Sequence, residues 1–315
     1  MSRVQRALAA VERRAGQAPA DAPHHSVLER AVLTVTFHPD RPARDGRTAA
    51  EALADDGVYR TQFETGVSSG GLDEVLAGAR RRWEQAMFDG AYDDASPAER
   101  PRYGGLDLLP HPDGACPRFG STHLRLRPHV LSRATFSWGD SVLLPTAVGT
   151  WDRIEPVLAA AAAADAPELA GRRRPGPERL DHYVEAQVHG GLHLSDVEAV
   201  VTDPSYRGTA VERHLAAACE RYGAALRWHD GYALPLDALD EAFRGPEPVR
   251  LARTACERLG GDVLDPALLG RAAVSILADP GTWHDEGAVT ALQHLKYLWH
   301  HLAAFGYRID RTPGT

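Results

Sequence analysis

The residues with the clearest chemical potential lie just before a glycine pair. Tyr183, Glu185 and Gln187 alternate with apolar residues, so the two-residue period of a strand predicts that they share one face. Gly190 and Gly191 follow, and such a pair is typical of backbone that adopts positive φ or passes close to a ligand. A carboxylate held in this way can stabilise positive charge that develops on a bound sugar. The alternative interpretation is an amphipathic edge strand with a solvated glutamate.

Two segments upstream supply candidate partners for this glutamate. Arg60 lies on a predicted strand, and its guanidinium fork can bind phosphate oxygens in two places while keeping its charge at any working pH. Thr135 and Ser137 alternate along a second predicted strand, with Phe136 between them. This hydroxyl pair could orient a carboxylate, although it is also a common packing feature. An aromatic ring could cover a ligand ring, and the candidates are Tyr183, Phe136 and Tyr103.

The hydrophobic pattern predicts an α+β core with helices on both sides of it in the sequence. We expect an N-terminal helical segment at 1–30, the α+β core at 31–230 and a C-terminal helical subdomain at 231–315. Predicted strands lie at 32–37, 58–63, 121–126, 130–137, 180–188, 197–201 and 226–229. Predicted helices lie at 3–15, 26–31, 48–55, 72–88, 151–164, 208–222, 236–243, 249–259, 266–277 and 287–305.

Two glycine-rich stretches are candidate binding loops. Residues 91–121 contain several prolines and glycines, including Gly104 and Gly105, and a long irregular connection inside a compact domain often binds a ligand. Residues 66–71 precede a predicted helix and could contact substrate beside Arg60 through backbone N–H groups. A turn with a helix cap is the simpler interpretation of the second stretch.

Composition narrows the possible partners and the compartment. The 315 residues carry a formal charge of −8, which argues against nucleic-acid binding through a general basic field. There is no signal-peptide pattern and no run of about 18 apolar residues, so we expect neither export by a classical signal nor a membrane span. Three cysteines without a Cys-x-x-Cys spacing indicate a reducing, cytoplasmic setting.

The segment from Glu185 to Leu192 resembles the glutamate motif of the ADP-ribosyltransferase superfamily, in the branch with an Arg, Ser-Thr-Ser, Glu signature. In that family the catalytic glutamate begins a mostly apolar run that ends in a glycine pair. Arg60 resembles the family's arginine, and residues 134–137 resemble a variant of its hydroxyl strand. Tyr183 stands where many members carry an acceptor-selecting Glu or Gln. The whole chain also resembles the bacterial family DUF3626.

This resemblance implies an ADP-ribosyltransferase-like split β core and an NAD-dependent ADP-ribosyltransferase or NAD glycohydrolase. Glu185 would stabilise the oxocarbenium-like ribose, Arg60 would anchor NAD, and Thr135 and Ser137 would complete the catalytic set. NAD is then a substrate, and the acceptor of ADP-ribose could be a protein side chain, a nucleic-acid base, a small molecule or water. Besides Arg60, the residues implied in binding NAD are Phe136, Tyr183, Gln187, Gly190 and Gly191.

Two other classes of function remain open at the level of sequence. His189, His193 and Asp196 lie in one short segment, and imidazole with carboxylate could form the metal site of a hydrolase. Against this, the intervening glycines prevent the helical i, i+4 presentation of two histidines that is common in metalloproteases. The third class is a non-catalytic interaction module on the same fold, with the C-terminal helices docking a partner.

Overall fold

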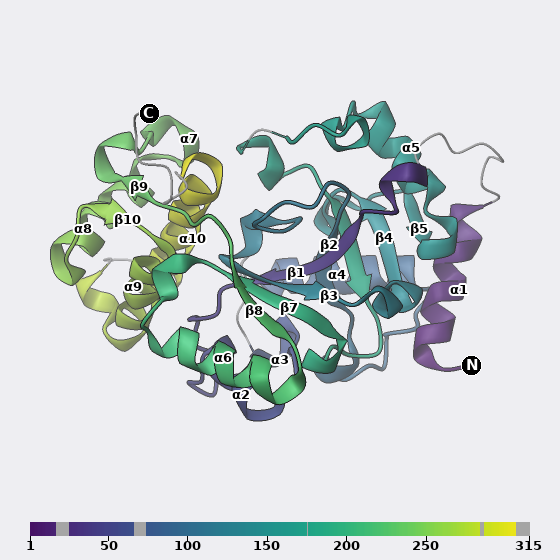
Figure 1. Ribbon diagram of the computed structural model, residues 1–315, viewed down its shortest axis with the longest axis horizontal. Helices are drawn as coiled ribbons and strands as arrows, with labels where there is room; N and C mark the ends of the chain where they lie inside the picture. Colours follow the sequence, from purple (N-terminus) through teal and green to yellow (C-terminus); the bar gives the residue numbers. More distant parts are fainter. Residues whose placement is uncertain (17–24, 66–73, 175, 284–286, 307–315) are drawn as a thin grey trace.

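A large mixed sheet dominates the computed structural model, which describes residues 1–16, 25–65, 74–174, 176–283 and 287–306 (Figure 1). The strand order is β5-β4-β6-β2-β1-β3-β7-β8. Neighbouring strands are antiparallel, except that β7 and β8 are parallel. The strands are β1 (Val32–Phe37), β2 (Arg102–Asp107), β3 (Thr122–Leu126), β4 (Ala134–Trp138), β5 (Val148–Thr150), β6 (Val184–Val188), β7 (Val197–Thr202) and β8 (Ala225–Trp228).

The two faces of the sheet differ in polarity. Register places Ser137, Glu185 and Gly105 side by side on one face, while their neighbours along each strand point to the other face. That second face is apolar and forms the main core with three helices. They are α2 (Ala49–Asp56), α5 (Glu155–Ala163) and α6 (Ala210–Tyr222). The sheet therefore buries one face in a conventional core and leaves polar side chains on the other.

Helices at the two ends of the chain lie on opposite sides of the sheet (Figure 1). At one end, α1 (Arg3–Ala15) and α4 (Glu74–Met87) form a small apolar cluster with β5 through Val11, Trp83 and Val148. At the other end, four helices form a core of their own. They are α7 (Glu241–Arg244), α8 (Pro246–Leu259), α9 (Pro266–Ala278) and α10 (Ala288–Phe305), accompanied by a hairpin of β9 (Leu234–Pro235) and β10 (Val263–Leu264).

The C-terminal helices are tied to the sheet at two points. Trp299 in α10 donates from Nε1 to the carbonyl of Pro117, 2.9 Å away, in the short 3₁₀ turn η3 (Pro117–Phe119). Asp40, just after β1, accepts a 3.1 Å hydrogen bond from the Tyr206 hydroxyl. Its carboxylate also lies against α9 at Gly270, where a Cβ would stand 1.6 Å from Asp40 Oδ2. A larger residue at that position of α9 would therefore force the Asp40 side chain to move.

The structure corrects the sequence prediction for residues 91–121. Part of that predicted irregular loop is β2, a central strand that pairs with both β1 and β6. Its glycines are required by close packing: a Cβ on Gly104 would lie 2.2 Å from the carbonyl of Thr34, and one on Gly105 would lie 2.4 Å from Cys116 Sγ. Two adjacent glycines are typical of a loop, but here one allows close approach of a neighbouring strand and the other allows close packing of the segment that contains Cys116.

The predicted strand at 58–63 is also wrong. Val58 forms only an isolated bridge with His193, Arg60 lies outside regular structure, and Gln62–Thr65 is the short helix α3. Other predicted elements differ more mildly. A 3₁₀ turn replaces strand at 130–133, and the predicted strand at 180–188 begins only at Val184. The predicted helix at 26–31 is a 3₁₀ turn followed by a hydrogen-bonded turn, and the one at 236–243 is a 3₁₀ turn followed by α7. The glycine-rich stretch at 66–71 lies outside the described residues. No described helix is long and apolar enough to cross a bilayer.

Candidate functional site

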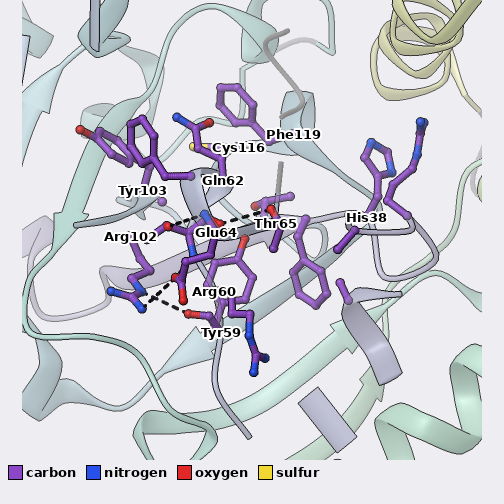
Figure 2. Close-up of a pocket in the computed structure, with 18 of the residues that line it drawn as sticks. His38, Tyr59, Arg60, Gln62, Glu64, Thr65, Arg102, Tyr103, Cys116 and Phe119 are labelled. Carbon is purple, nitrogen blue, oxygen red and sulfur yellow. Dashed lines mark hydrogen bonds and ion pairs between the residues drawn. The ribbon is translucent and has the colours of Figure 1, made fainter. Parts of the chain in front are cut away.

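A cavity of about 760 Å³ lies where β1, β2 and β6 meet α4, η3 and α10. Figure 2 shows Tyr103 at one side of this cavity and His38 at the other, with Tyr59 and Arg60 between them. Among the described residues, its lining carries seven Arg or Lys side chains and five Asp or Glu side chains. The cavity is therefore positive in a chain whose formal charge is −8, and it is suited to an anionic ligand. Its size is ordinary for a small-molecule site.

Glu185 is the buried carboxylate of this cavity, with only 3% of its surface exposed. It accepts a 3.0 Å hydrogen bond from Gln187 Nε2 and a 3.2 Å bond from the Ser141 backbone N–H. Burial raises the pKa of Glu185 to about 7, and Asp140 adds to this effect while Arg80 opposes it. The group is thus poised between its two protonation states near neutral pH, and a cationic ligand would favour the carboxylate.

A directed chain of hydrogen bonds ends on Glu185. Thr135 Oγ1 donates to Gln187 Oε1 at 2.8 Å, so its oxygen must accept from His189 Nε2, 3.0 Å away. His189 Nδ1 then accepts from the Tyr92 hydroxyl at 2.7 Å. Each group therefore donates to the next, from Tyr92 through His189, Thr135 and Gln187 to the carboxylate. This chain of hydrogen bonds holds Glu185 in one rotamer.

The hydroxyl strand predicted from the sequence is therefore adjacent to Glu185 but outside the cavity. Thr135 and Ser137 are fully buried on the same sheet face as Glu185. Ser137 Oγ donates to the carbonyl of Gly139 at 3.3 Å and lies 3.5 Å from Gln187 Nε2. Neither hydroxyl, nor Gln187, lines the cavity. The structure thus places all three beside Glu185 and outside the cavity lining, with Gln187 bonded directly to its carboxylate.

Arg60 does line the cavity, as expected, but it is engaged with a neighbouring acid. Its guanidinium pairs with the carboxylate of Asp56, four residues earlier at the end of α2, and a quarter of its side chain is exposed. The cation that lowers the pKa of Glu185 is instead Arg80 of α4. Its Cζ lies 4.1 Å from the centroid of the Tyr103 ring, and the Tyr103 hydroxyl donates to Glu84 at 2.8 Å.

Four other predicted ligand contacts lie away from the cavity. Phe136 is on the opposite sheet face, in the apolar core against Trp151, so alternation along β4 prevents it from covering a ligand beside Glu185. Tyr183 is buried behind the cavity wall, with its ring 5.9 Å from that of Phe119. Gly190 and Gly191 have the expected positive φ, 76° and 86°, but they shape the turn after β6 and do not line the cavity.

The proposed metal ligands do not converge on one point. The ring of His189 is occupied by Tyr92 and Thr135, whereas Asp196 pairs with Arg133 at 2.8 Å. His193 packs edge-on against Tyr222 and contacts Ser195. Burial and the nearby Arg133 lower the pKa of His189 to about 3, so its ring is neutral. Within the described part of the chain, no group of three or more His, Cys, Asp or Glu side chains is arranged to hold a metal ion.

Sequence reasoning missed several side chains that line the cavity. They come from elements far apart in the chain: His38 after β1, Arg80 in α4, Cys116 before η3 and Lys296 in α10. For His38 there was a signal, because it directly follows a predicted strand that ends in a turn. Nothing local distinguishes Arg80 from the two arginines that follow it in α4.

Comparison with known proteins places the chain in a family. The family described as "Protein of unknown function (DUF3626)" matches residues 32–164 and 161–305. The chain belongs to the DUF3626 family. This confirms the family expected from the sequence, and the matched residues include all walls of the cavity that the structure describes. The cavity is thus a feature of the DUF3626 region itself.

Two phage proteins are similar to part of this DUF3626 chain. "Gene 2 protein" of Mycobacterium phage L5 is 26% identical over 167 residues, which is 47% of this chain and 59% of the phage protein. "Gene 2 protein" of Mycobacterium phage D29 is 27% identical over 167 residues, covering 48% and 60%. The aligned segment thus spans about 60% of each of these curated relatives.

Proposed function

We propose that this DUF3626 member is an NAD-dependent ADP-ribosyltransferase, or an NAD glycohydrolase when water is the acceptor. The observation that carries the proposal is the position of Glu185: a buried carboxylate in the wall of a large, positive cavity. The cavity has the parts that a dinucleotide requires, namely a carboxylate for the reacting ribose, guanidinium groups for phosphates and aromatic side chains for the bases. The resemblance of residues 185–192 to the transferase motif supports the same assignment.

The chemistry assigns Glu185 one specific task. As the bond between the ribose and nicotinamide breaks, its electron pair leaves with nicotinamide and positive charge develops on the ribose. A fixed carboxylate stabilises that charge, and the acceptor then attacks the anomeric carbon. Glu185 must be ionised for this role. Its pKa of about 7 would fall when the cationic nicotinamide ring of NAD binds beside it.

The other residues take supporting roles in this proposal. Gln187 and Thr135 hold Glu185 in one rotamer through the hydrogen-bond chain, and Ser137 packs beside them. Arg60 remains a candidate phosphate anchor at the cavity wall. Tyr103 offers a ring face to nicotinamide once Arg80, which now covers that face, moves aside.

The test is release of nicotinamide from NAD by the purified protein. We expect wild-type protein to release it and Glu185→Gln to be slower by about 10²- to 10³-fold, the usual loss when one charge-stabilising group is removed from a transition state. Glu198→Gln is the matched control, because Glu198 lies on the same sheet but pairs with Arg125 and does not line the cavity. Full activity in Glu185→Gln would remove Glu185 from the mechanism.

Two further measurements separate the competing classes of function. Turnover that is unchanged by a chelator supports the transferase, while turnover abolished by it favours a metal-dependent hydrolase. Failure to bind NAD at all would favour a non-catalytic interaction module. Labelled NAD distinguishes the acceptors, because a glycohydrolase yields free ADP-ribose whereas a transferase yields a labelled conjugate.

A further inference from the structure

One wall of the cavity comes from the C-terminal helices. Lys296, the only lysine of the chain, lines the cavity from α10, and Arg118 lines it from η3. The hydrogen bond from Trp299 Nε1 to the carbonyl of Pro117 holds α10 against η3. These contacts bring two cationic side chains to the same side of the cavity, from segments almost 180 residues apart in the sequence.

Further donors gather behind Lys296 around the ring of Tyr297. Lys296 Nζ lies 5.8 Å from the centroid of this ring, and Arg244 Cζ lies 6.0 Å from it. The ring of His300, one turn further along α10, is 5.9 Å away. His300 is only 1% exposed, yet neither ring nitrogen has a hydrogen-bond partner among the described residues, and Arg244 Nε is also without one.

The charge of this cluster is poorly compensated. Arg118 pairs with Asp181, but Lys296 forms no ion pair with any residue that the structure describes. Burial is the main cause that lowers the pKa of Lys296, and repulsion from Arg118 and Arg244 lowers it further. Asp140 raises this pKa, but its effect is the smallest of the four. Burial and the same cations lower the pKa of His300 to about 2. His300 is therefore neutral and has one N–H to donate.

Buried polar groups without partners, beside uncompensated cations, are costly unless a ligand satisfies them. A phosphoryl group meets these requirements at the cavity surface, since its oxygens can accept from an ammonium and a guanidinium fork together. We propose that Lys296 and Arg118, which both line the cavity, bind a phosphoryl group on its α10 side, with His300 and Arg244 adding polar groups behind them. This deepens the proposed function, on which it rests for the identity of the whole ligand: the phosphate belongs either to NAD or to its acceptor.

Inorganic pyrophosphate is the probe, titrated calorimetrically at low, fixed ionic strength because salt screens such interactions. We expect Lys296→Gln to bind it about tenfold more weakly than wild type, the effect of losing one hydrogen bond to a charged group. Arg118→Gln should behave similarly. Arg250→Gln is the control, because it removes the same charge from an exposed pair with Glu247 in α8. Wild-type affinity in Lys296→Gln, or no binding of pyrophosphate by wild type at millimolar concentration, would overturn the site.

Competition identifies the source of the phosphate. In Glu185→Gln protein, where NAD should persist uncleaved, displacement of pyrophosphate by NAD assigns the site to the NAD diphosphate. Simultaneous binding of the two assigns it to a phosphate-bearing acceptor. The two proposals fail separately: pyrophosphate binding that depends on Lys296, without nicotinamide release, keeps the site and rejects the transferase. If nicotinamide release depends on Glu185 but pyrophosphate binding is unchanged in Lys296→Gln, the transferase is kept and the phosphate site is rejected.

Discussion

The two ends of β6 are equally buried, but they differ in how completely their polar groups are satisfied. At one end, Glu185 faces a cavity, and burial raises its pKa to about 7. At the other end, His189 has both ring nitrogens bonded to protein groups, and Arg133 donates to the carbonyl of Gly191 at 2.6 Å and to Asp196. One hydrogen-bond chain connects the two ends.

This difference separates a group that a ligand can reach from one that holds the fold together. The sequence motif joins the glutamate and the glycine pair as if they acted on one ligand. In the structure, the glycine turn is a closed network anchored by Arg133, and the glutamate alone reaches the cavity. A titratable group that lines a cavity and has a shifted pKa is a candidate functional residue, and of the residues in this motif only Glu185 meets that description.

The largest expected effect tests the Glu185 end through the pH dependence of stability. Between the ordinary glutamate pKa of 4.5, which applies to the unfolded chain, and the folded pKa of about 7, the folded state keeps a proton that the unfolded chain releases. Wild-type protein should therefore lose stability as pH rises through this window, and Glu185→Gln should lack this component. Relative to wild type, the variant should gain about 3 kcal/mol between pH 4 and pH 8. Urea unfolding at both pH values measures it, and parallel pH profiles would contradict the raised pKa.

An intermediate effect is expected at the turn end from Arg133→Ala. The substitution leaves the carbonyl of Gly191 and part of the Asp196 carboxylate without their donor, which should lower the free energy of unfolding by about 2 kcal/mol. If the turn is purely structural, kcat for nicotinamide release should stay within about twofold of wild type below the melting temperature. A large loss of kcat in folded protein would instead show that the glycine turn and Glu185 act together in the reaction.

The smallest effect should come from the far end of the hydrogen-bond chain. Tyr92→Phe removes the donor to His189 Nδ1 and leaves that buried nitrogen unsatisfied, so we expect a loss of about 1 kcal/mol in unfolding free energy. Phe keeps the ring packing against Phe88. Thermal unfolding beside wild type checks this, and an unchanged melting temperature would show that the Tyr92–His189 bond contributes little.

Local sequence patterns predicted much of the fold. The N-terminal helix at 3–15, the strand at 32–37 and the helix at 266–277 agree with the structure within one residue. The strand is a β-branched, apolar run, and the two helices have N-caps, Ser2 and Asp265, whose side chains accept from the backbone. The pattern failed at β2. Its two glycines suggested a loop, but they are required because the Thr34 carbonyl and Cys116 Sγ approach the strand closely. That approach depends on residues distant in the chain, which no local pattern records.

The same limit explains what was found and missed at the site. Glu185 could be identified from strand alternation and the turn after it. Arg80 and Lys296 reach the same cavity only through the packing of α4 and α10, and neither side chain has a distinctive neighbour in the sequence. Phe136 shows the converse error, since its aromatic character suggested a ligand contact while its register placed it in the core.

The contact between Asp40 and Gly270 has an evolutionary consequence. A Cβ at position 270 would overlap the Asp40 carboxylate where it now lies, so a side chain there would displace the aspartate from its contact with α9. Homologues that replace the glycine should therefore carry a smaller residue at position 40, and homologues that keep the aspartate should keep the glycine. Covariation of these two positions across an alignment would indicate that the sheet and the C-terminal helices have been inherited as one unit.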